Sequence, residues 1–277
     1  MPIAGTGPVL RIDAGSLFRF GAERGVQTWP AVLDLWPDPT APGTPGAVGP
    51  VEETAAINGL SSALQVLGAP DRSLEIRRFT ASDVTPLIER ICLARNGAQH
   101  VLASRQGDDV EIRHVEVTAE SDVGRHVAEL LSCDEPMSTD QPTSTDQPTS
   151  TRKVSPTLSA PTDELAERLA GVRGADGLVD ALHALGAPVA DAVALASALS
   201  RCHTRTEIVA ISQHRVGGTQ SSGAVAVFDS QRGRIVASPS RSPDGRVWTT
   251  LAPGGGHRIA QAVGLLMETL PEGRWMP

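Results

Sequence analysis

The sequence offers little positive charge to a partner. It contains a single lysine, Lys153, among 24 basic residues, and 32 acidic residues bring its formal net charge to −8. A surface of this balance is not cationic on average, which argues against a large contact with nucleic acid or with an anionic membrane. We therefore expect no nucleic-acid partner. The preference for arginine over lysine follows codon composition and indicates a GC-rich bacterial genome.

Long apolar runs are absent as well. Nowhere do about eighteen apolar residues follow one another, and residues 1–6 lack the basic and apolar regions of a secretory signal. The sequence thus predicts no membrane insertion and no export by the usual route. Its three cysteines, Cys92, Cys133 and Cys202, are odd in number and far apart, so we expect reduced thiols, two of them buried, in a cytoplasmic protein.

Motifs of known enzyme chemistry are missing too. The sequence has no GxSxG and no HExxH, and its seven histidines lack the spacing of zinc ligands. The Gly-rich turn 253–256 precedes a helix and could present N–H groups to a phosphate, but it matches neither GxGxxG nor the P-loop pattern. We expect no enzyme, no catalytic residue, no metal ligand and no cofactor. A small-molecule enzyme that uses this turn is the least favoured alternative.

One segment occurs twice. Residues 59–70 return as residues 177–188, with the leucines and the closing Gly-Ala-Pro shared. Four strand-like runs and an amphipathic helix follow each copy. The repeat therefore predicts an α/β fold of the α+β type, in which two quasi-symmetric halves share a central sheet. Each half would consist of a helix, an antiparallel meander of strands and a second helix.

The first half is expected to span residues 1–133. Alternation and turn residues predict strands over 29–36, 73–79, 90–95, 100–105 and 110–117, and apolar periodicity predicts helices over 51–67 and 122–131. Residues 134–161 are rich in Ser, Thr and Pro and carry a duplicated STDQPT, so we expect a disordered linker.

The second half is expected to span residues 162–277. The same patterns predict helices over 162–169, 175–185, 189–199 and 257–270, and strands over 207–212, 224–229, 234–239 and 247–251. The repeated helical segment, the four strands that follow it and the closing helix thus mirror those of the first half.

Two stretches have more apolar side chains than their position explains. The connection 80–89 between the first two strands of the first meander holds Val84, Leu87 and Ile88. An apolar loop indicates either a recognition loop or one that folds back onto its own sheet. The helical pair 176–200 has wide apolar sides, including Val189 and Leu195, which suit either docking of a partner helix or internal packing.

One set of motifs lies mainly in the C-terminal half. It comprises Glu207–Ala210, Gly233–Arg241, Asp244–Gly245, Trp248, Pro253–Gly254 and Leu270–Trp275, with weaker matches at Trp29–Pro30, Ala69–Glu75, Arg95–Gly97 and His100–Ala103. In these motifs the chain resembles the EspG family of cytosolic chaperones in type VII (ESX) secretion. It covers most of the chain outside the linker and the N-terminal tail. It implies a quasi-symmetric fold, in agreement with the repeat.

The resemblance also implies a partner and a surface. The partner would be a PE/PPE heterodimer, and the chaperone would cover the apolar tip of the PPE protein and keep it soluble. The protein-binding residues would lie in the loop 80–89 and the helices 176–200, with a polar rim. They are Phe79, Val84, Leu87, Ile88, Val189, Leu195, Arg201 and Gln213. The main alternative is a non-catalytic scaffold or adaptor for another partner, and a homodimer of the free protein stays open.

Overall fold

The computed structural model describes residues 8–37, 50–82, 84–132, 156–213, 219–270 and 274–276. The first half contains β1 (Leu10–Asp13), α1 (Ala14–Glu23), the short 3-10 helix η1 (Ala31–Leu33), α2 (Pro50–Gly68), β2 (Arg72–Thr80), β3 (Leu87–Asn96), β4 (Gln99–Gln106), β5 (Asp109–His114) and α3 (Glu120–Ser132). The second contains β6 (Leu158–Pro161), α4 (Thr162–Leu169), α5 (Gly174–Ala184), α6 (Val189–Ser200), β7 (Cys202–Gln213), β8 (Thr219–Ser230), β9 (Gly233–Arg241), β10 (Val247–Pro253) and α7 (Gly256–Glu268).

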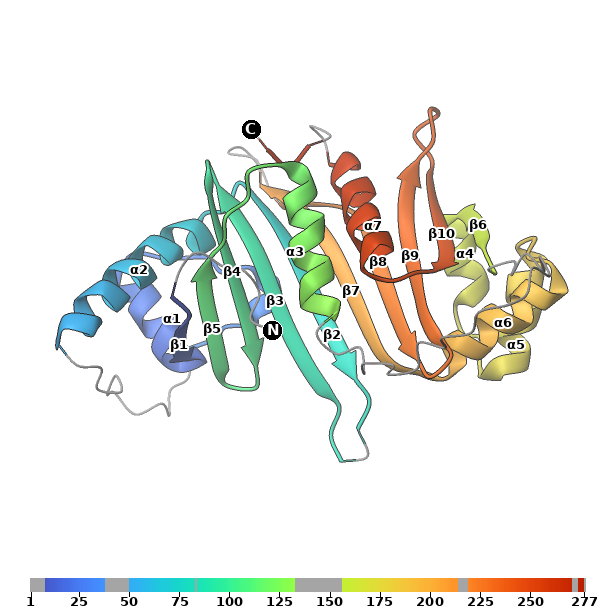
Figure 1. The fold of residues 1–277 in the computed structure, drawn as a ribbon, viewed down its shortest axis with the longest axis horizontal. Coiled ribbons are helices and arrows are strands. Elements are labelled where there is room, and N and C mark those ends of the chain that lie inside the picture. Colours follow the sequence, from blue (N-terminus) through green and yellow to red (C-terminus); the bar gives the residue numbers. More distant parts are fainter. Residues whose placement is uncertain are drawn as a thin grey trace, which may run out of the picture.

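One sheet of ten strands joins the two halves. Its order is β1-β5-β4-β3-β2-β7-β8-β9-β10-β6, so each half contributes five adjacent strands in the same succession outward from the centre (Figure 1). The central strands β2 and β7 are antiparallel, with Ile76 opposite Ile208. This arrangement confirms the quasi-symmetric fold that the repeat predicts. The second half has one additional helix, α6, between the repeated segment and the meander.

The expected disordered linker, residues 134–161, extends too far toward the C-terminus. Residues 158–161 form β6, which pairs with β10 as an edge strand of the second half, so the expectation of disorder is wrong for these four residues. The short run LSAP is weakly patterned and ends in proline, which a sheet tolerates at an edge. Residues 134–155 lie outside the described residues. The division into two halves at the linker stays a prediction.

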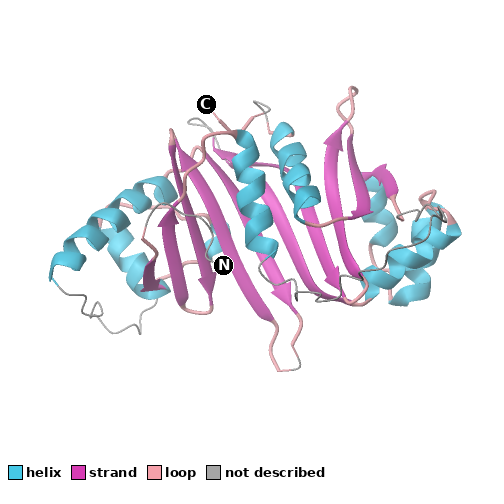
Figure 2. Ribbon diagram, in the orientation of Figure 1, coloured by secondary structure: helices cyan, strands magenta, loops and turns pink. Residues whose placement is uncertain are grey.

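The two faces of the sheet carry different helices. On one face α3 and α7 lie side by side over the central strands, and the core there includes Leu74, Ile76, Ile208 and Val227 (Figure 2). On the other face α1 and α2 cover one end of the sheet, and α4, α5 and α6 belong to the core at the other end. Because successive residues of a strand point to opposite faces, each strand supplies both layers.

The repeated segments occupy equivalent places in the two end layers, which are the helices α1 and α2 at one end of the sheet and α4, α5 and α6 at the other. Leu64 of α2 and Leu182 of α5 are fully buried, each in the core under its own helices. Gly186 follows α5 in the left-handed conformation, at φ 97°, as a C-terminal cap requires. Its counterpart Gly68 remains helical, and a Cβ there would stand 3.0 Å from Val26 Cγ1. The repeat therefore keeps glycine in both copies for different reasons.

The C-terminal residues 274–276 pack against the first half and link the second half to it. Trp275 is fully buried; its indole Nε1 donates to Nε2 of His100 at 3.1 Å, and its backbone N–H donates to Glu120 Oε1 at 2.6 Å. Arg95 donates to its carbonyl oxygen. Burial is the main cause that lowers the pKa of His100 to about 4. The ring is therefore neutral near pH 7 and can accept the indole hydrogen bond.

The region before α2 differs from expectation. A strand was predicted over residues 29–36, but residues 31–33 form η1, which lies on the sheet face over β2, β3 and β4. Val32, Leu33 and Leu35 point into the core, and Asp34 reverses the chain in the left-handed conformation. The strand β1 and the helix α1 were not predicted. Asp13 caps α1 by accepting from the backbone N–H of Ser16 at 2.7 Å.

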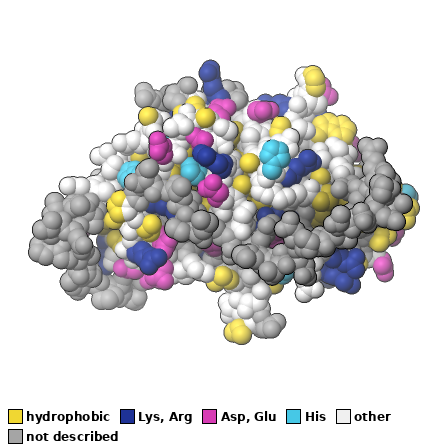
Figure 3. Space-filling model, viewed as in Figure 1, with side chains coloured by type: hydrophobic (Ala, Val, Ile, Leu, Met, Phe, Trp, Pro, Cys, Tyr) yellow, Lys and Arg dark blue, Asp and Glu magenta, His cyan; other side chains and the backbone are white. Residues whose placement is uncertain are grey.

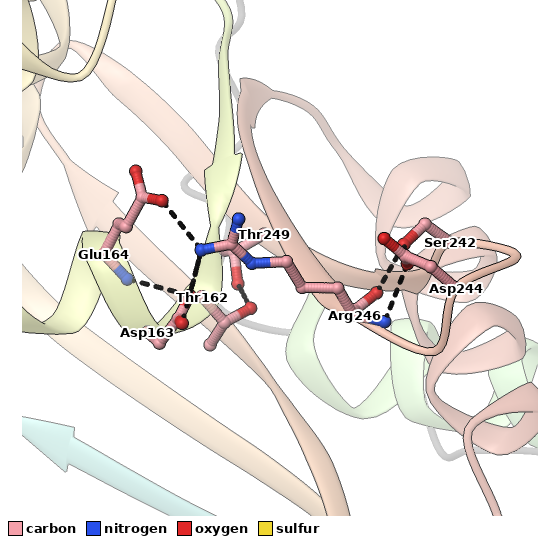
Figure 4. A network of polar contacts seen from close by, with 7 residues as sticks. All are labelled: Thr162, Asp163, Glu164, Ser242, Asp244, Arg246 and Thr249. Atoms are coloured by element: carbon pink, nitrogen blue, oxygen red, sulfur yellow. Dashed lines mark hydrogen bonds and ion pairs between the residues drawn. The ribbon is translucent and has the colours of Figure 1, made fainter.

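A polar network holds α4 against the β9–β10 hairpin (Figure 4). Nη2 of Arg246 donates to Glu164 Oε1 at 2.7 Å and to Asp163 Oδ1 at 3.2 Å, while Thr162 and Thr249 share a hydrogen bond of 2.8 Å. The bond to Glu164 is the leading cause that raises the pKa of Arg246. The exposed ion pairs and the more buried threonine pair together orient the outer end of the second half.

Candidate functional site

The β2–β3 hairpin projects beyond its neighbours (Figure 1). Strand β4 ends at Gln106, opposite Glu89, whereas β3 continues back to Leu87, which pairs with Thr80. The connecting loop is therefore residues 81–86. The expectation that Leu87 and Ile88 lie in a loop is wrong, because both are strand residues. Val84 in the loop is 92% exposed and Leu87 is 46% exposed.

The pleat of β3 separates the two expected contact residues. Ile88 lies opposite Phe79, on the face that carries the end layers of helices, and Leu87 shares the other face with Ile91, beneath α3 and α7. Figure 3 views the molecule from the α3 and α7 side and shows hydrophobic atoms on the projecting hairpin. On this side lies a groove of about 410 Å³ lined by Leu87, Leu130 and charged side chains of β2, β3 and β5.

On the opposite face, α2 packs on β3 to β5 at one end of the sheet, and α6 packs on β8 and β9 at the other end. Between these two layers of helices lies a strip of the sheet face. We call it the central strip. Strand register places its members on one face: Phe79 is opposite both Ile88 and Arg205, and Arg77 is opposite both Arg90 and Glu207. The central strip is defined as Arg77, Phe79, Ile88, Arg90, Arg205 and Glu207.

The central strip combines a half-buried apolar pair with cations. Phe79 and Ile88 are partly exposed. The guanidinium of Arg205 lies 5.1 Å from the ring centroid of Phe79, within the range of a cation–π contact. Nη2 of Arg205 also pairs with Glu207 Oε1 at 3.1 Å. Such a surface can bury apolar atoms of a partner and exchange hydrogen bonds at its edges.

The helices α5 and α6 present a second apolar surface. Val189 and Val193 of α6 are 59% and 50% exposed. A groove of about 390 Å³ between the two helices is lined by Val179 and Val193, with Asp176 and Arg201 among its polar residues. Leu195 was expected here, but it is fully buried against the sheet, so its assignment to the binding surface is wrong. Helical periodicity turns it away from Val193.

The structure brings only some of the polar rim together. Arg201 is exposed and directly precedes β7, whose Thr204 pairs with Thr80 at the base of the hairpin. Gln213 is exposed at the other end of β7, nine residues beyond Thr204 and thus roughly 30 Å away. Gln213 therefore does not belong to this surface. Val189 begins α6 and lies about 18 Å along the helix from Arg201.

Sequence reasoning missed Arg205. Its strand reads Thr204-Arg205-Thr206-Glu207, an all-polar run in which nothing marks one face as a contact surface. Thr204 and Thr206 are buried and Arg205 is exposed, so the two-residue period of a strand could have placed Arg205 on the outer face. That Arg205 lies beside Phe79, however, follows only from the pairing of β2 with β7.

The groups that could carry chemistry are dispersed. No cluster of three or more His, Cys, Asp or Glu side chains suited to a metal ion occurs in the part of the chain that the structure describes. Cys92 is buried, and burial raises the pKa of its thiol well above the ordinary value. Cys202 is partly buried, with its pKa raised mainly by burial, and Cys133 lies outside the described residues. Thiols of raised pKa are poor nucleophiles.

The Gly-rich turn is an ordinary entry into a helix. Gly255 caps α7, and the preceding strand β10 pairs antiparallel with β9 and β6, unlike the strand of a dinucleotide-binding unit. Gly254 donates to the carbonyl of Arg234 at 3.2 Å. Among the described residues, no helix is long and apolar enough to cross a membrane.

Comparison with solved structures agrees with the architecture. A structure of the Mycobacterium tuberculosis type VII secretion system chaperone EspG5, in complex with the PE25-PPE41 dimer, matches with a TM-score of 0.70. The match covers 97% of this chain and 99% of that chain, at 17% sequence identity. At this identity the likeness establishes the fold.

Curated relatives give the same family at higher identity. The chain is 29% identical to the ESX-1 secretion-associated protein EspG1 of M. tuberculosis over 214 residues, which is 77% of this chain and 66% of that protein. It is 34% identical over 107 residues to EspG3, an ESX-3 secretion-associated protein of Mycolicibacterium smegmatis, covering 38% of this chain and 36% of that protein. The chain thus spans about two thirds of the length of EspG1.

The family model for EspG matches residues 51–264, from the start of α2 into the last helix. The match includes both repeated segments, both meanders and the surfaces described above. Because it covers well over half of the 277 residues, the chain belongs to the EspG family.

Proposed function

We propose that this protein is a non-catalytic cytoplasmic chaperone of type VII secretion, which binds PE/PPE heterodimers and covers an apolar tip of the PPE protein. The family membership and the solved complex of EspG5 with a PE25-PPE41 dimer support this proposal. The single observation that carries it in this chain is the projecting β2–β3 hairpin with apolar side chains exposed on it.

The contact residues that we propose are those the structure leaves accessible. Val84, Leu87, Ile88 and Phe79 belong to the hairpin, and Arg201 stands at its base. Val189 adds the exposed start of α6. Two of the residues expected from sequence, Leu195 and Gln213, leave the set because one is buried and the other is remote.

Shielding of apolar surface is sufficient as a mechanism. Removal of roughly 400 Å² of apolar surface from water contributes about 10 kcal/mol at about 25 cal/mol per Å². Association costs of rigid-body and side-chain entropy offset part of this gain, and the remainder allows stable binding. A chaperone of this kind needs no nucleotide and no covalent step.

Co-expression tests the proposal. The chain is produced with each PE/PPE pair of the organism that encodes it, affinity-purified, and analysed by size-exclusion chromatography with light scattering. A three-protein complex with one pair is the expected result. Recovery of the chain alone in every case, with the PE/PPE pairs expressed and soluble, contradicts the proposal.

A further inference from the structure

The last three described residues dock in a pocket of the first half. Residues 274–276 follow α7 after residues 271–273, which lie outside the described residues, and we call them the clasp. Within the clasp Trp275 is fully buried, Met276 is half-buried and Arg274 is exposed. One large side chain thus fills the pocket, while its two neighbours stay in contact with solvent.

The pocket holds the backbone of the clasp from two sides. Glu120, the first residue of α3, accepts with Oε1 from the backbone N–H of Trp275 at 2.6 Å and from that of Met276 at 3.3 Å. Arg95 of β3 donates to the carbonyl oxygen of Trp275. The clasp belongs to no helix or strand, so side chains of the first half satisfy its backbone groups, as they do for a bound peptide.

The side chain of Trp275 is recognised by a histidine. Indole Nε1 donates to Nε2 of His100 at 3.1 Å, and the two rings are stacked with their centroids 6.3 Å apart. A buried indole needs an acceptor for its N–H, and only a neutral imidazole offers one. Burial, and after it the charges of Arg95 and His126, keeps the pKa of His100 low. The pocket therefore favours tryptophan over other aromatic side chains.

The charged groups of the pocket keep other partners when the clasp is out. Nη2 of Arg95 lies 3.6 Å from Oδ2 of Asp71, a half-exposed carboxylate. Glu120 stands in the first turn of α3, where the partial positive charge of a helix N-terminus stabilises a carboxylate. Withdrawal of the clasp therefore leaves neither charge uncompensated in an apolar environment, which is the situation that would make an open pocket too costly.

The junction between the halves does not depend on the clasp. Strand β7 pairs with the whole length of β2, and α3 packs closely on α7, with Gly124 beside Ala260. Short segments near a chain end open at a lower free energy than central strands. Because Trp275 is fully buried, its departure is one discrete step and differs from gradual fraying.

We propose that the clasp has two states, closed and open, and that it passes between them while the ten-stranded sheet stays folded. In the closed state it ties the chain after α7 to β3, β4 and α3 of the first half. In the open state it exposes an indole and the pocket that recognises it, so a ligand of either one would hold it open. This inference is independent of the proposed function, since none of these contacts involves the projecting hairpin or the central strip.

Hydrogen exchange of the full wild-type chain, followed amide by amide by NMR at pH 7, tests the two states. The amides of Trp275 and Met276 should exchange at least about tenfold faster than the most protected amides of β2 and β7, and at least about tenfold slower than in an unfolded peptide of the same sequence. Exchange as slow as that of the central strands would mean that the clasp opens only on global unfolding. Exchange as fast as that of the peptide would mean that it is not closed. Either result overturns the proposal.

A substitution far from the clasp separates local from global opening. Leu64→Ala removes buried contacts of α2, so it should accelerate the most protected amides of β2 and β7 at least about tenfold. The amides of the clasp should keep the wild-type rate, because its open state retains the core around Leu64. Equal acceleration of the clasp and the central strands contradicts local opening.

Two substitutions with matched controls test the named contacts. Glu120→Ala removes the acceptor of both clasp amides and should accelerate their exchange at least about tenfold, whereas Glu116→Ala, at an exposed position before α3, should leave it unchanged. Trp275→Phe keeps most of the ring area but loses the indole donor, and should accelerate exchange at least about threefold; Trp248→Phe in β10 should not.

Unchanged clasp exchange in both Glu120→Ala and Trp275→Phe would show that these contacts do not close the clasp, and the proposal would fall. Where one of the variants does not fold, the wild-type comparison of the clasp with β2 and β7 decides.

Discussion

Leu87 and Ile88 are adjacent in β3, yet their side chains lie on opposite faces of the sheet: Ile88 shares a face with Phe79, and Leu87 lies with Thr80 on the side of α3. A partner that docks on the central strip contacts Ile88 far more than Leu87. A partner that grips the hairpin from both sides contacts both residues.

Two substitutions distinguish these modes of binding. If the central strip is the docking surface, Ile88→Asp buries an unpaired charge in the contact and should weaken capture of a PE/PPE pair at least a hundredfold, a loss of several kcal/mol. Leu87→Asp should weaken it less than tenfold. Both are exposed or half-buried, so melting temperatures should stay close to that of wild type. Equal losses in pull-down titrations favour the two-sided grip, and undiminished binding by both variants removes the hairpin from the interface.

The repeated leucines provide a test of the internal symmetry. Leu64 and Leu182 are buried in equivalent end layers, so replacement of either by alanine leaves a cavity and should lower the free energy of unfolding by about 2 to 5 kcal/mol. Urea unfolding followed by circular dichroism measures both. Val193→Ala, at an exposed position of α6, is the control and should change stability by less than about 0.5 kcal/mol. A neutral Leu64→Ala or Leu182→Ala in a folded protein argues against structural equivalence.

The contact between α3 and α7 depends on a glycine. A Cβ on Gly124 would stand 2.6 Å from the carbonyl oxygen of Ala260, and backbone atoms of a packed helix cannot easily yield. Gly124→Ala should therefore destabilise the protein by about 1 to 3 kcal/mol in thermal or urea unfolding. Gly264→Ala in α7 has open space around its Cβ and should be neutral or stabilising by up to about 1 kcal/mol. A tolerated Gly124→Ala indicates that the two helices lie farther apart.

The contact of His100 with Trp275 predicts a dependence of stability on pH. Burial lowers the pKa of His100 from about 6.5 to about 4. Between these values the unfolded chain binds a proton that the folded protein does not, so the free energy of unfolding falls as pH is lowered through this window. The loss amounts to about 3 kcal/mol at most. In urea unfolding at pH 7, 6, 5 and 4, His100→Gln should show a shallower decline than wild type.

A second histidine serves as the control for this measurement. His257 is exposed near the start of α7, and His257→Gln should keep the wild-type decline. Identical slopes for wild type and His100→Gln contradict the buried, neutral histidine.

Much of the fold could be predicted because its signals are local. The helix predicted over 162–169 has the bounds of α4, and the meander strands were found because Gly97 and Gly107 occupy the left-handed turns between them. Apolar spacing of the repeat identified α2 and α5. These elements need only their own sequence to be recognised.

The rest depends on pairing and packing between distant segments. The side on which Leu87 and Ile88 lie follows from the register with β2, and the burial of Leu195 follows from the docking of α6 on β8 and β9. Residues 29–36 carry an apolar pattern that suits a strand and also a short turn lying on a sheet. Trp36 donates to its near neighbour Asp34, but Asp34 is itself held by Arg90 of β3 and Arg105 of β4, which are far from it in the sequence.

The central claim is that this protein shields an apolar tip, and its most direct measurement is the solubility of a cognate PE/PPE pair. The pair is purified under mild denaturant, diluted into buffer, and its light scattering followed with increasing amounts of the chain. The account predicts that wild type suppresses aggregation up to an equimolar ratio and that folded Ile88→Asp does not. Scattering that is unaffected by wild type, or suppressed equally by Ile88→Asp and by an unrelated protein, would contradict it.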